Sequence, residues 1–105
     1  MKRTGKYYVY IVKCKNGTYY TGYTKDIDKR IKLHNSGRGA KYLRGKGPVD
    51  LVYYREYKYY KNALNAELEI KSYPRKKKEG LIKTYYNRRR DDEQQKYRPP
   101  VSSRN

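Results

Sequence analysis

The residues of this chain that could do chemistry are few and lie apart in the sequence. Arg30 and His34, the only histidine, are one helical turn apart, Glu67 comes much later, and Tyr10 and Tyr20 are two of sixteen tyrosines. The chain has no Ser-His-Asp spacing, no Walker-type loop and no HExxH segment. With one cysteine and one histidine, it has no transition-metal site of the usual kind. The groups that remain are a guanidinium, an imidazole, a carboxylate and phenols.

Three of these side chains interrupt helix faces that are otherwise apolar. At 100° per residue, Arg30 and His34 fall within the stripe of Ile27 and Ile31. Glu67 falls within a second stripe, which is made of two alanines and an isoleucine. A charged group on a buried face costs free energy unless it is paired or used, so the positions of these three residues favour a site.

Each candidate also has a purely structural explanation when it is taken alone. Arg30 can extend along apolar surface to reach water, His34 can cap carbonyls at a helix end, and Glu67 can pair with Arg30. Tyr10 and Tyr20 receive almost no weight from composition, because tyrosine is so abundant. The order of all five along the chain is what favours function over these explanations.

A hairpin must position the tyrosines. Residues 7–14 are rich in aromatic and β-branched side chains and predict a strand, and residues 18–23 predict the returning strand. Asn16-Gly17 between them is a strong signal for a hairpin turn. Since the chain has no Phe and no Trp, tyrosine must also supply aromatic core volume, with hydrogen-bond partners for its buried hydroxyls.

Helices and one more strand complete the predicted elements. The first is a helix that Thr24 or Asp26 caps and Gly37 ends, and a glycine-rich basic loop over 37–48 follows it. A strand over 49–57 comes next and is apolar enough to be central. The last two elements are a helix over 63–72 capped by Asn62 and a helix that Pro74 opens. This order predicts an α/β (α+β) domain over residues 1–83, with a three-stranded antiparallel central sheet flanked by helices. Residues 84–105, where the apolar pattern stops, are expected to form a charged, mobile C-terminal tail.

The charge of the chain points to a polyanionic partner. Lys and Arg number 28 and Asp and Glu number 10, which gives a formal net charge of +18, and residues 84–105 carry only +3 of it. Nucleic acid is the first partner that such a surface predicts, and an anionic membrane is the second. No stretch approaches the roughly 20 apolar residues of a membrane span. The single Cys14 excludes a disulfide framework, so we expect an intracellular location, in cytoplasm or nucleus.

The order of the motifs resembles that of the GIY-YIG endonuclease superfamily, in particular its small single-domain branch. Tyr8-Val9-Tyr10 matches the first motif, Tyr20-Thr21-Gly22 the second, Arg30 the family arginine, and Ala63 to Glu67 with Ile70-Lys71 the segment of the metal-binding glutamate. His34, Lys77 and Leu81-Ile82 also fit, so the resemblance covers about residues 7–83. Tyr8 stands where the first motif usually has glycine, and Asn87 is only the residue nearest to an asparagine that some members carry.

The resemblance implies a divalent-metal-dependent endonuclease that hydrolyses DNA phosphodiester bonds with structure selectivity or low sequence specificity. Glu67 would hold one Mg²⁺ or Mn²⁺, and Arg30 would contact the scissile phosphate. Tyr10, Tyr20 or His34 would deprotonate the attacking water; we favour Tyr10 or His34 as the base and Tyr20 as the residue that positions the water. Gly22 is the structural glycine of the second motif. A free-standing domain of this kind predicts a second copy or a protein partner for cutting both strands.

Basic residues outside this set are the expected contacts to the DNA backbone. They are Arg38, Lys41, Arg44 and Lys46 in the loop, Lys71 after the glutamate, and Lys76, Lys77 and Lys78. Any one of these lysines could equally be a solvated surface charge. The alternative function is a basic nucleic-acid-binding module on the same fold that does not cleave, and a ribosomal or membrane-surface protein would explain the charge but not the motif order. We expect DNA, including branched DNA, as the partner and no membrane.

Overall fold

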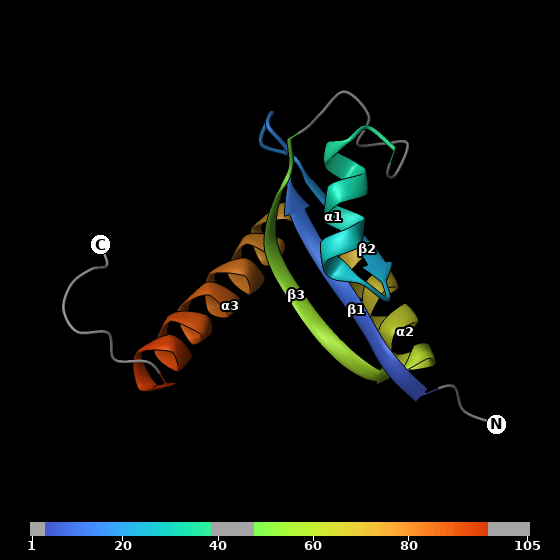
Figure 1. Ribbon diagram of the computed structural model, residues 1–105. Coiled ribbons are helices and arrows are strands. Elements are labelled where there is room, and N and C mark those ends of the chain that lie inside the picture. Colours follow the sequence, from blue (N-terminus) through green and yellow to red (C-terminus); the bar gives the residue numbers. More distant parts are fainter. Residues whose placement is uncertain (1–3, 39–47, 97–105) are drawn as a thin grey trace.

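Helices cover both faces of a three-stranded antiparallel sheet (Figure 1). The computed structural model describes residues 4–38 and 48–96. Its elements in chain order are β1 (Thr4–Lys13), β2 (Tyr19–Thr24), α1 (Ile27–Asn35), β3 (Asp50–Tyr59), α2 (Tyr60–Lys71) and α3 (Arg75–Lys96). These elements confirm the predicted fold class of a small α/β domain whose sheet is flanked by helices.

The central strand of the sheet is β1, because the strand order is β2-β1-β3. The prediction that the strand after the loop is central is therefore wrong, since β3 lies at an edge. Val9, Ile11 and Val12 of β1 have no exposed surface, and they point alternately into the two layers beside the sheet. β3 instead mixes half-buried and exposed side chains along its second half, as an edge strand does.

The predicted hairpin between the first two strands is confirmed. β1 and β2 pair antiparallel, with Tyr10 directly opposite Gly22. The N–H of Gly17 donates to the carbonyl of Cys14 over 2.9 Å and closes the turn. This register decides which tyrosines face which helix, because a slip of one residue would reverse every side chain of the strand.

The first helix forms as predicted and covers one face of the sheet. Of the two predicted caps, Asp26 is the cap, and its carboxylate accepts a backbone N–H of the first turn over 3.0 Å. The helix ends at Asn35, two residues before Gly37, whose φ of 83° lies in the left-handed region that favours glycine. Ile27 and Ile31 of α1 pack on the side of β1 that carries Tyr10.

The second helix lies on the other face of the sheet and begins directly after β3. Its first residue is Tyr60, so the predicted cap at Asn62 is wrong. The strand stays paired with β1 as far as Tyr59, and the chain enters the helix at the next residue with no loop between them. Ala63 and Ile70 of α2 are buried in the core on this face, in the positions that the apolar stripe predicts.

The third helix continues past the predicted boundary of the domain. It runs over Arg75–Lys96, so the boundary expected at residue 84 falls inside it. Leu81, Ile82 and Tyr85 pack against the core, and the ring of Tyr85 meets that of Tyr53 edge to face at 5.4 Å. The inward-facing stripe of the helix thus goes on after residue 84 with a tyrosine in place of an aliphatic residue.

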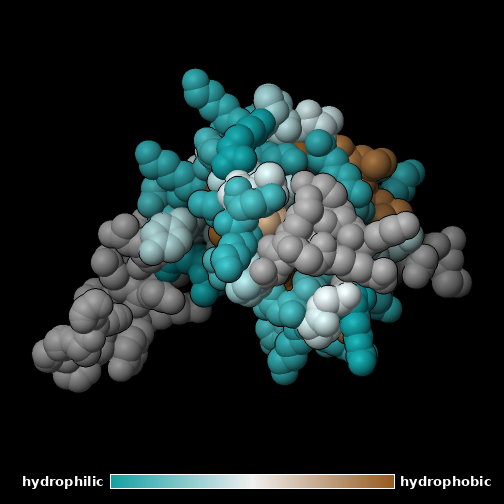
Figure 2. Space-filling model, turned by 90° about the horizontal axis from the view of Figure 1, so that it is seen from above, coloured by the Kyte–Doolittle hydropathy of each residue, from teal (hydrophilic) through white to brown (hydrophobic). Residues whose placement is uncertain are grey.

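The coloured part of the face seen from above is mostly hydrophilic (Figure 2). Figure 2 shows teal side chains over much of the face seen from above, with brown apolar atoms in a small area near its rim. Among the described residues, the large apolar side chains left exposed are Leu68 on α2 and Tyr86 on α3. Within residues 4–38 and 48–96, no helix is long and apolar enough to cross a membrane.

Candidate active site

A tyrosine of the central strand and the histidine of α1 form the centre of the site. The hydroxyl of Tyr10 lies 2.8 Å from Nε2 of His34 in a buried hydrogen bond. Only 1% of Tyr10 and 2% of His34 is exposed. The bond joins residues far apart in sequence, and it exists because α1 packs with its histidine over this face of β1. The structure therefore brings together two of the residues that the sequence singled out.

The glycine of the second motif allows the Tyr10 hydroxyl to reach its place. A Cβ atom at position 22 would lie 2.5 Å from the hydroxyl oxygen of Tyr10 and 2.6 Å from the ring carbon that bears it. These distances are far inside van der Waals contact, so any side chain on Gly22 would displace the ring. The strand pairing places Gly22 directly opposite Tyr10, which explains physically why this position has no side chain.

The second motif tyrosine lies beside this pair. The ring of Tyr20 is 6.4 Å from that of Tyr10 and 5.8 Å from that of His34, which it meets edge to face. Tyr20 is half-buried, whereas the other two are almost fully covered. The three rings thus form one aromatic cluster, and Tyr20 is its member nearest to solvent.

The electrostatics of the cluster keep its two buried members neutral at pH 7. Burial, reinforced by the neighbouring Tyr20, raises the pKa of Tyr10 well above its usual range, and Glu67 acts in the same direction while Arg30 opposes it. Burial, followed by the charge of Arg30, lowers the pKa of His34 below its usual 6.5. Arg30 of α1 and Glu67 of α2 thus act in opposite directions on the pKa of the same hydroxyl.

The glutamate that was predicted to bind metal sits on the sheet-facing side of α2. Its side chain is 17% exposed, and its Oε2 lies 3.0 Å from Nζ of Lys71 one turn later. Glu67 thus forms its ion pair within its own helix. A purely structural role for Glu67 had been expected to involve a pair with Arg30. Among the described residues, no group of three His, Cys, Asp or Glu side chains could hold a metal ion.

The expected DNA-backbone contacts fall into three sets. Lys41, Arg44 and Lys46 lie outside the described residues. Arg38 after α1 and Lys76 and Lys77 in the first turn of α3 are exposed, whereas Lys78 is half-buried. Lys71 is drawn to the candidate metal ligand by its ion pair. Contact of Arg38, Lys76, Lys77 and Lys78 with the DNA backbone stays a prediction.

One residue that supports the site gave no signal in the sequence. Nη2 of Arg75, at the start of α3, donates to the carbonyl of Gly17 in the hairpin turn over 2.9 Å. Its guanidinium also lies 4.6 Å from the ring centre of Tyr19, next to the motif tyrosine Tyr20. The arginine joins α3 to the hairpin that carries Tyr20. Its partners are remote in sequence, so no local spacing could reveal it.

A model of the GIY-YIG catalytic domain family matches residues 6–90 of this chain. The chain belongs to the GIY-YIG family. The resemblance that was drawn from the motif order is thereby confirmed, and the matched segment extends into α3 beyond the residue where the motifs end.

Relatives and solved structures agree with this membership. The chain is 54% identical to a UPF0213 protein of Staphylococcus saprophyticus over 77 residues, which are 73% of this chain and 94% of the relative. It is similar to the solution NMR structure of the UPF0213 protein BH0048 from Bacillus halodurans, with a TM-score of 0.52, 49% identity, and coverage of 76% of this chain and 85% of that one. A second NMR structure, of a protein from E. faecalis, has a TM-score of 0.55 at 35% identity and covers 82% and 92%.

Proposed function

We propose that this GIY-YIG protein is a divalent-metal-dependent endonuclease that hydrolyses DNA phosphodiester bonds. The observation that carries the proposal is the 2.8 Å contact between the Tyr10 hydroxyl and His34, with Tyr20 beside it. The charges of Arg30 and Glu67 act on the same hydroxyl. Phosphodiester hydrolysis needs an activated water, a cation for the growing phosphorane charge and help for the leaving oxygen, and this set holds a candidate for each need.

The carboxylate of Glu67 fits a hard divalent cation. Mg²⁺ and Mn²⁺ prefer oxygen ligands, and Mg²⁺ is commonly held by one or two carboxylates together with waters and substrate phosphate. A single carboxylate therefore suits an open site better than a dedicated protein cage. Lys71 has a half-exposed side chain, so it can leave the carboxylate when a cation binds. The bound ion would supply positive charge to the scissile phosphate and the leaving oxygen.

Arg30 is the proposed phosphate contact. It lies on α1, one turn before His34, and is half-buried, so its guanidinium is only partly screened by water. A planar guanidinium fork can donate two parallel hydrogen bonds to phosphate oxygens, which a lysine cannot do. Arg30 would hold the phosphate and oppose the negative charge that grows on it during attack.

The Tyr10–His34 pair is the proposed proton acceptor. A neutral imidazole that carries its proton on Nδ1 can accept the Tyr10 proton at Nε2, so the Tyr10 oxygen takes a proton from water as its own proton moves to His34. This route avoids a free phenolate, which the burial of Tyr10 disfavours. Half-buried Tyr20 lies nearer to solvent than either member of the pair and would position the attacking water.

DNA binding by this chain is proposed to depend on charge more than on base sequence. The exposed basic side chains of Arg38, Lys76 and Lys77 suit phosphate contacts, which carry little sequence information and give a steep dependence on salt. We therefore propose structure-selective or weakly specific cleavage, with a second copy or a protein partner when both strands are cut.

Cleavage assays with matched variants test the proposal. Supercoiled plasmid and branched and flapped oligonucleotides are incubated with Mg²⁺, Mn²⁺ or EDTA. Glu67→Ala should lower metal-dependent cleavage by about 100-fold or more, because the site loses its cation ligand. Glu69→Ala, which removes an exposed carboxylate from the same helix, should cut as the wild type does and controls for contaminating nuclease.

Two results would contradict the endonuclease. Equal cleavage by wild type and Glu67→Ala would show that a contaminant or another site cuts the DNA. Equal DNA binding by both proteins without cleavage under either metal would favour the alternative function, a basic nucleic-acid-binding module on the same fold.

A further inference from the structure

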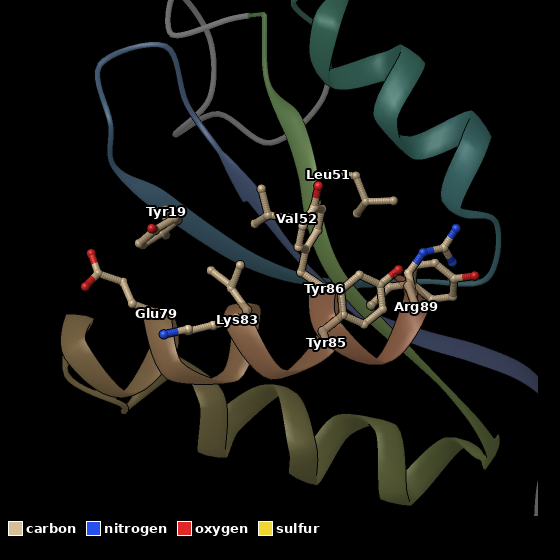
Figure 3. Close-up of a pocket in the computed structure, with 10 residues that line it drawn as sticks. Tyr19, Leu51, Val52, Glu79, Lys83, Tyr85, Tyr86 and Arg89 are labelled. Atoms are coloured by element: carbon tan, nitrogen blue, oxygen red, sulfur yellow. The ribbon is translucent and has the colours of Figure 1, made fainter. Parts of the chain in front are cut away.

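A groove lies along α3 where the helix passes the edge strand β3 (Figure 3). Its volume is about 590 Å³. Tyr19 and Glu79 lie toward one end, Tyr86 and Arg89 lie toward the other, and Leu51 lies on the wall opposite α3. None of the residues assigned to the active site is among the described residues that line this groove.

Tyrosine rings give the groove an aromatic wall. The ring of Tyr85 packs edge to face against that of Tyr53, with 5.4 Å between ring centres, and at a tilt against that of Tyr54, with 5.8 Å between ring centres. Tyr86, the next residue along α3, is 61% exposed. An exposed ring beside rings that are fixed by packing offers a flat apolar face to solvent.

The charge around these rings is positive. Lys83 and Arg89 line the groove, and the guanidinium of Arg89 lies 5.7 Å from the ring centre of Tyr85. The one carboxylate among the described lining residues, Glu79, accepts a hydrogen bond from Arg75 over 2.9 Å, which offsets its charge. Two further arginines, on β3 and α3, line the neighbouring hollow beside Tyr85. The groove therefore combines open aromatic surface with a net positive field.

We propose that this groove binds single-stranded DNA, with bases stacked on Tyr86 and phosphates near Lys83 and Arg89. Aromatic faces between cations suit single strands, because every base has a face to stack and the backbone supplies the opposite charge. A duplex keeps its base faces inside its own stack and cannot use Tyr86. The inference goes beyond the proposed endonuclease, since binding here needs neither a metal nor cleavage.

Charge argues against the other occupants of such a groove. A second copy of this chain would bring another +18 to a surface that is already basic, so self-association here would be opposed by repulsion. An apolar peptide segment would cover the tyrosines but would bring no negative charge to the positive field of the groove. Single-stranded DNA satisfies both the rings and the cations.

Binding to labelled oligodeoxythymidine in EDTA tests the proposal without cleavage. Fluorescence anisotropy is measured for wild type, Tyr86→Ala and Tyr86→Phe, on the single strand and on a duplex of equal length. Tyr86→Ala should weaken single-strand binding by about 5-fold or more, since stacking is worth roughly 1–3 kcal/mol per base. Tyr86→Phe keeps the ring and should bind as the wild type does, and duplex binding should not change in either variant.

Further variants separate stacking from general effects. Leu68→Ala removes a similarly exposed apolar side chain from α2 and should leave single-strand binding unchanged. Lys83→Gln should reduce the slope of log affinity against log salt by about 0.7 for a lost phosphate contact. Circular dichroism checks that each variant is folded, which the exposure of Tyr86 leads us to expect.

Four outcomes would overturn the proposal. Wild-type affinity of Tyr86→Ala for oligodeoxythymidine would show that the ring does not bind bases. An equal loss of affinity for single strand and duplex would show a general loss of DNA binding rather than stacking of unpaired bases on Tyr86. Tighter, Tyr86-dependent binding of oligouridine than of oligodeoxythymidine would assign the groove to RNA. A dimer in light scattering that Tyr86→Ala dissociates would assign it to a second copy.

Discussion

Two groups of tyrosines in this molecule differ in which part of the side chain is available. In the candidate active-site cluster, Tyr10 is 1% exposed and its hydroxyl bonds to His34, so its oxygen has a polar partner while its ring is hidden. In the groove along α3, Tyr86 is 61% exposed and its ring face is open. The chain has sixteen tyrosines and no other aromatic residue except its histidine, so burial rather than residue type separates the two roles.

The charges beside the two groups differ as well. At the candidate active site a guanidinium and a carboxylate act in opposite directions on the pKa of one hydroxyl, that of Tyr10. In the groove the cations outnumber the single lining carboxylate that the structure describes, and that carboxylate already has a partner. A balanced pair suits a reaction in which charge moves, whereas an excess of one sign suits retention of a polyanion. The predictions below test this contrast.

The largest difference should come from deleting one hydroxyl at the active site. Tyr10→Phe should lower metal-dependent cleavage by about 10²- to 10⁴-fold, the usual contribution of general acid–base catalysis, while DNA binding stays intact. Single-turnover cleavage and anisotropy measure the two effects separately. Tyr8→Phe removes a half-buried hydroxyl two residues away on the same strand and should cut normally. Full activity of Tyr10→Phe would remove the catalytic role from this cluster.

A methyl group at position 22 should destabilise the protein. Gly22→Ala places its Cβ 2.5 Å from the Tyr10 hydroxyl, so the free energy of unfolding should fall by about 1–3 kcal/mol, as in other overpacked cores. Urea denaturation measures this change, and cleavage should fall with it because the Tyr10 ring must move. An unchanged unfolding midpoint would mean that the close approach of Tyr10 and Gly22 does not exist in solution.

Alkaline pH should report the burial of Tyr10. Burial raises its pKa above the ordinary tyrosine value of 10.0, so the unfolded chain loses this proton first and stability falls as the pH rises past 10. The loss due to this residue should approach about 1.4 kcal/mol per pH unit above that point. Denaturation of wild type and Tyr10→Phe in parallel isolates this residue from the other tyrosines. Parallel curves for the two proteins up to pH 11 would contradict the expectation.

A glycine-to-alanine change in α3, near the groove, should raise the free energy of unfolding, whereas Gly22→Ala should lower it. Gly80 lies in α3, and a Cβ there would meet no atom within 4 Å. Gly80→Ala should therefore raise the free energy of unfolding by about 0.5–1 kcal/mol through helix propensity alone, with cleavage unchanged. Thermal unfolding measures the gain. A loss of stability would show that α3 is packed more closely at this point than the structure describes.

Local patterns predicted much of the fold because they depend on neighbouring residues. The hairpin follows from Asn16-Gly17 between two strand-forming runs, and α1 follows from the cap at Asp26 and the apolar spacing of its inner face. The errors occurred where a distant partner decides. Asn62 looked like a cap, but pairing of β3 with β1 carries the strand to Tyr59, and Tyr85 extends the core only because Tyr53 faces it.

The candidate site could be chosen from the sequence but not assembled from it. The side chains on the apolar faces of the helices, Arg30, His34 and Glu67, stand out because a charge there needs a use or a partner. Nothing in their spacing indicates that Tyr10 bonds to His34, whereas the i,i+4 spacing of Glu67 and Lys71 is itself a signal for their ion pair. The Tyr10–His34 contact depends on how α1 docks on the sheet.

The sequence by itself determined the family, the strongly basic character and the identity of the candidate residues, because motif order, composition and periodicity are properties of the chain. Tertiary structure alone decided that β1 is central, that a missing side chain at Gly22 makes room for a hydroxyl, and that Tyr86 stays in solvent while Tyr10 does not. The physical reason is that burial and close contact are set by packing between elements, which a one-dimensional pattern does not contain.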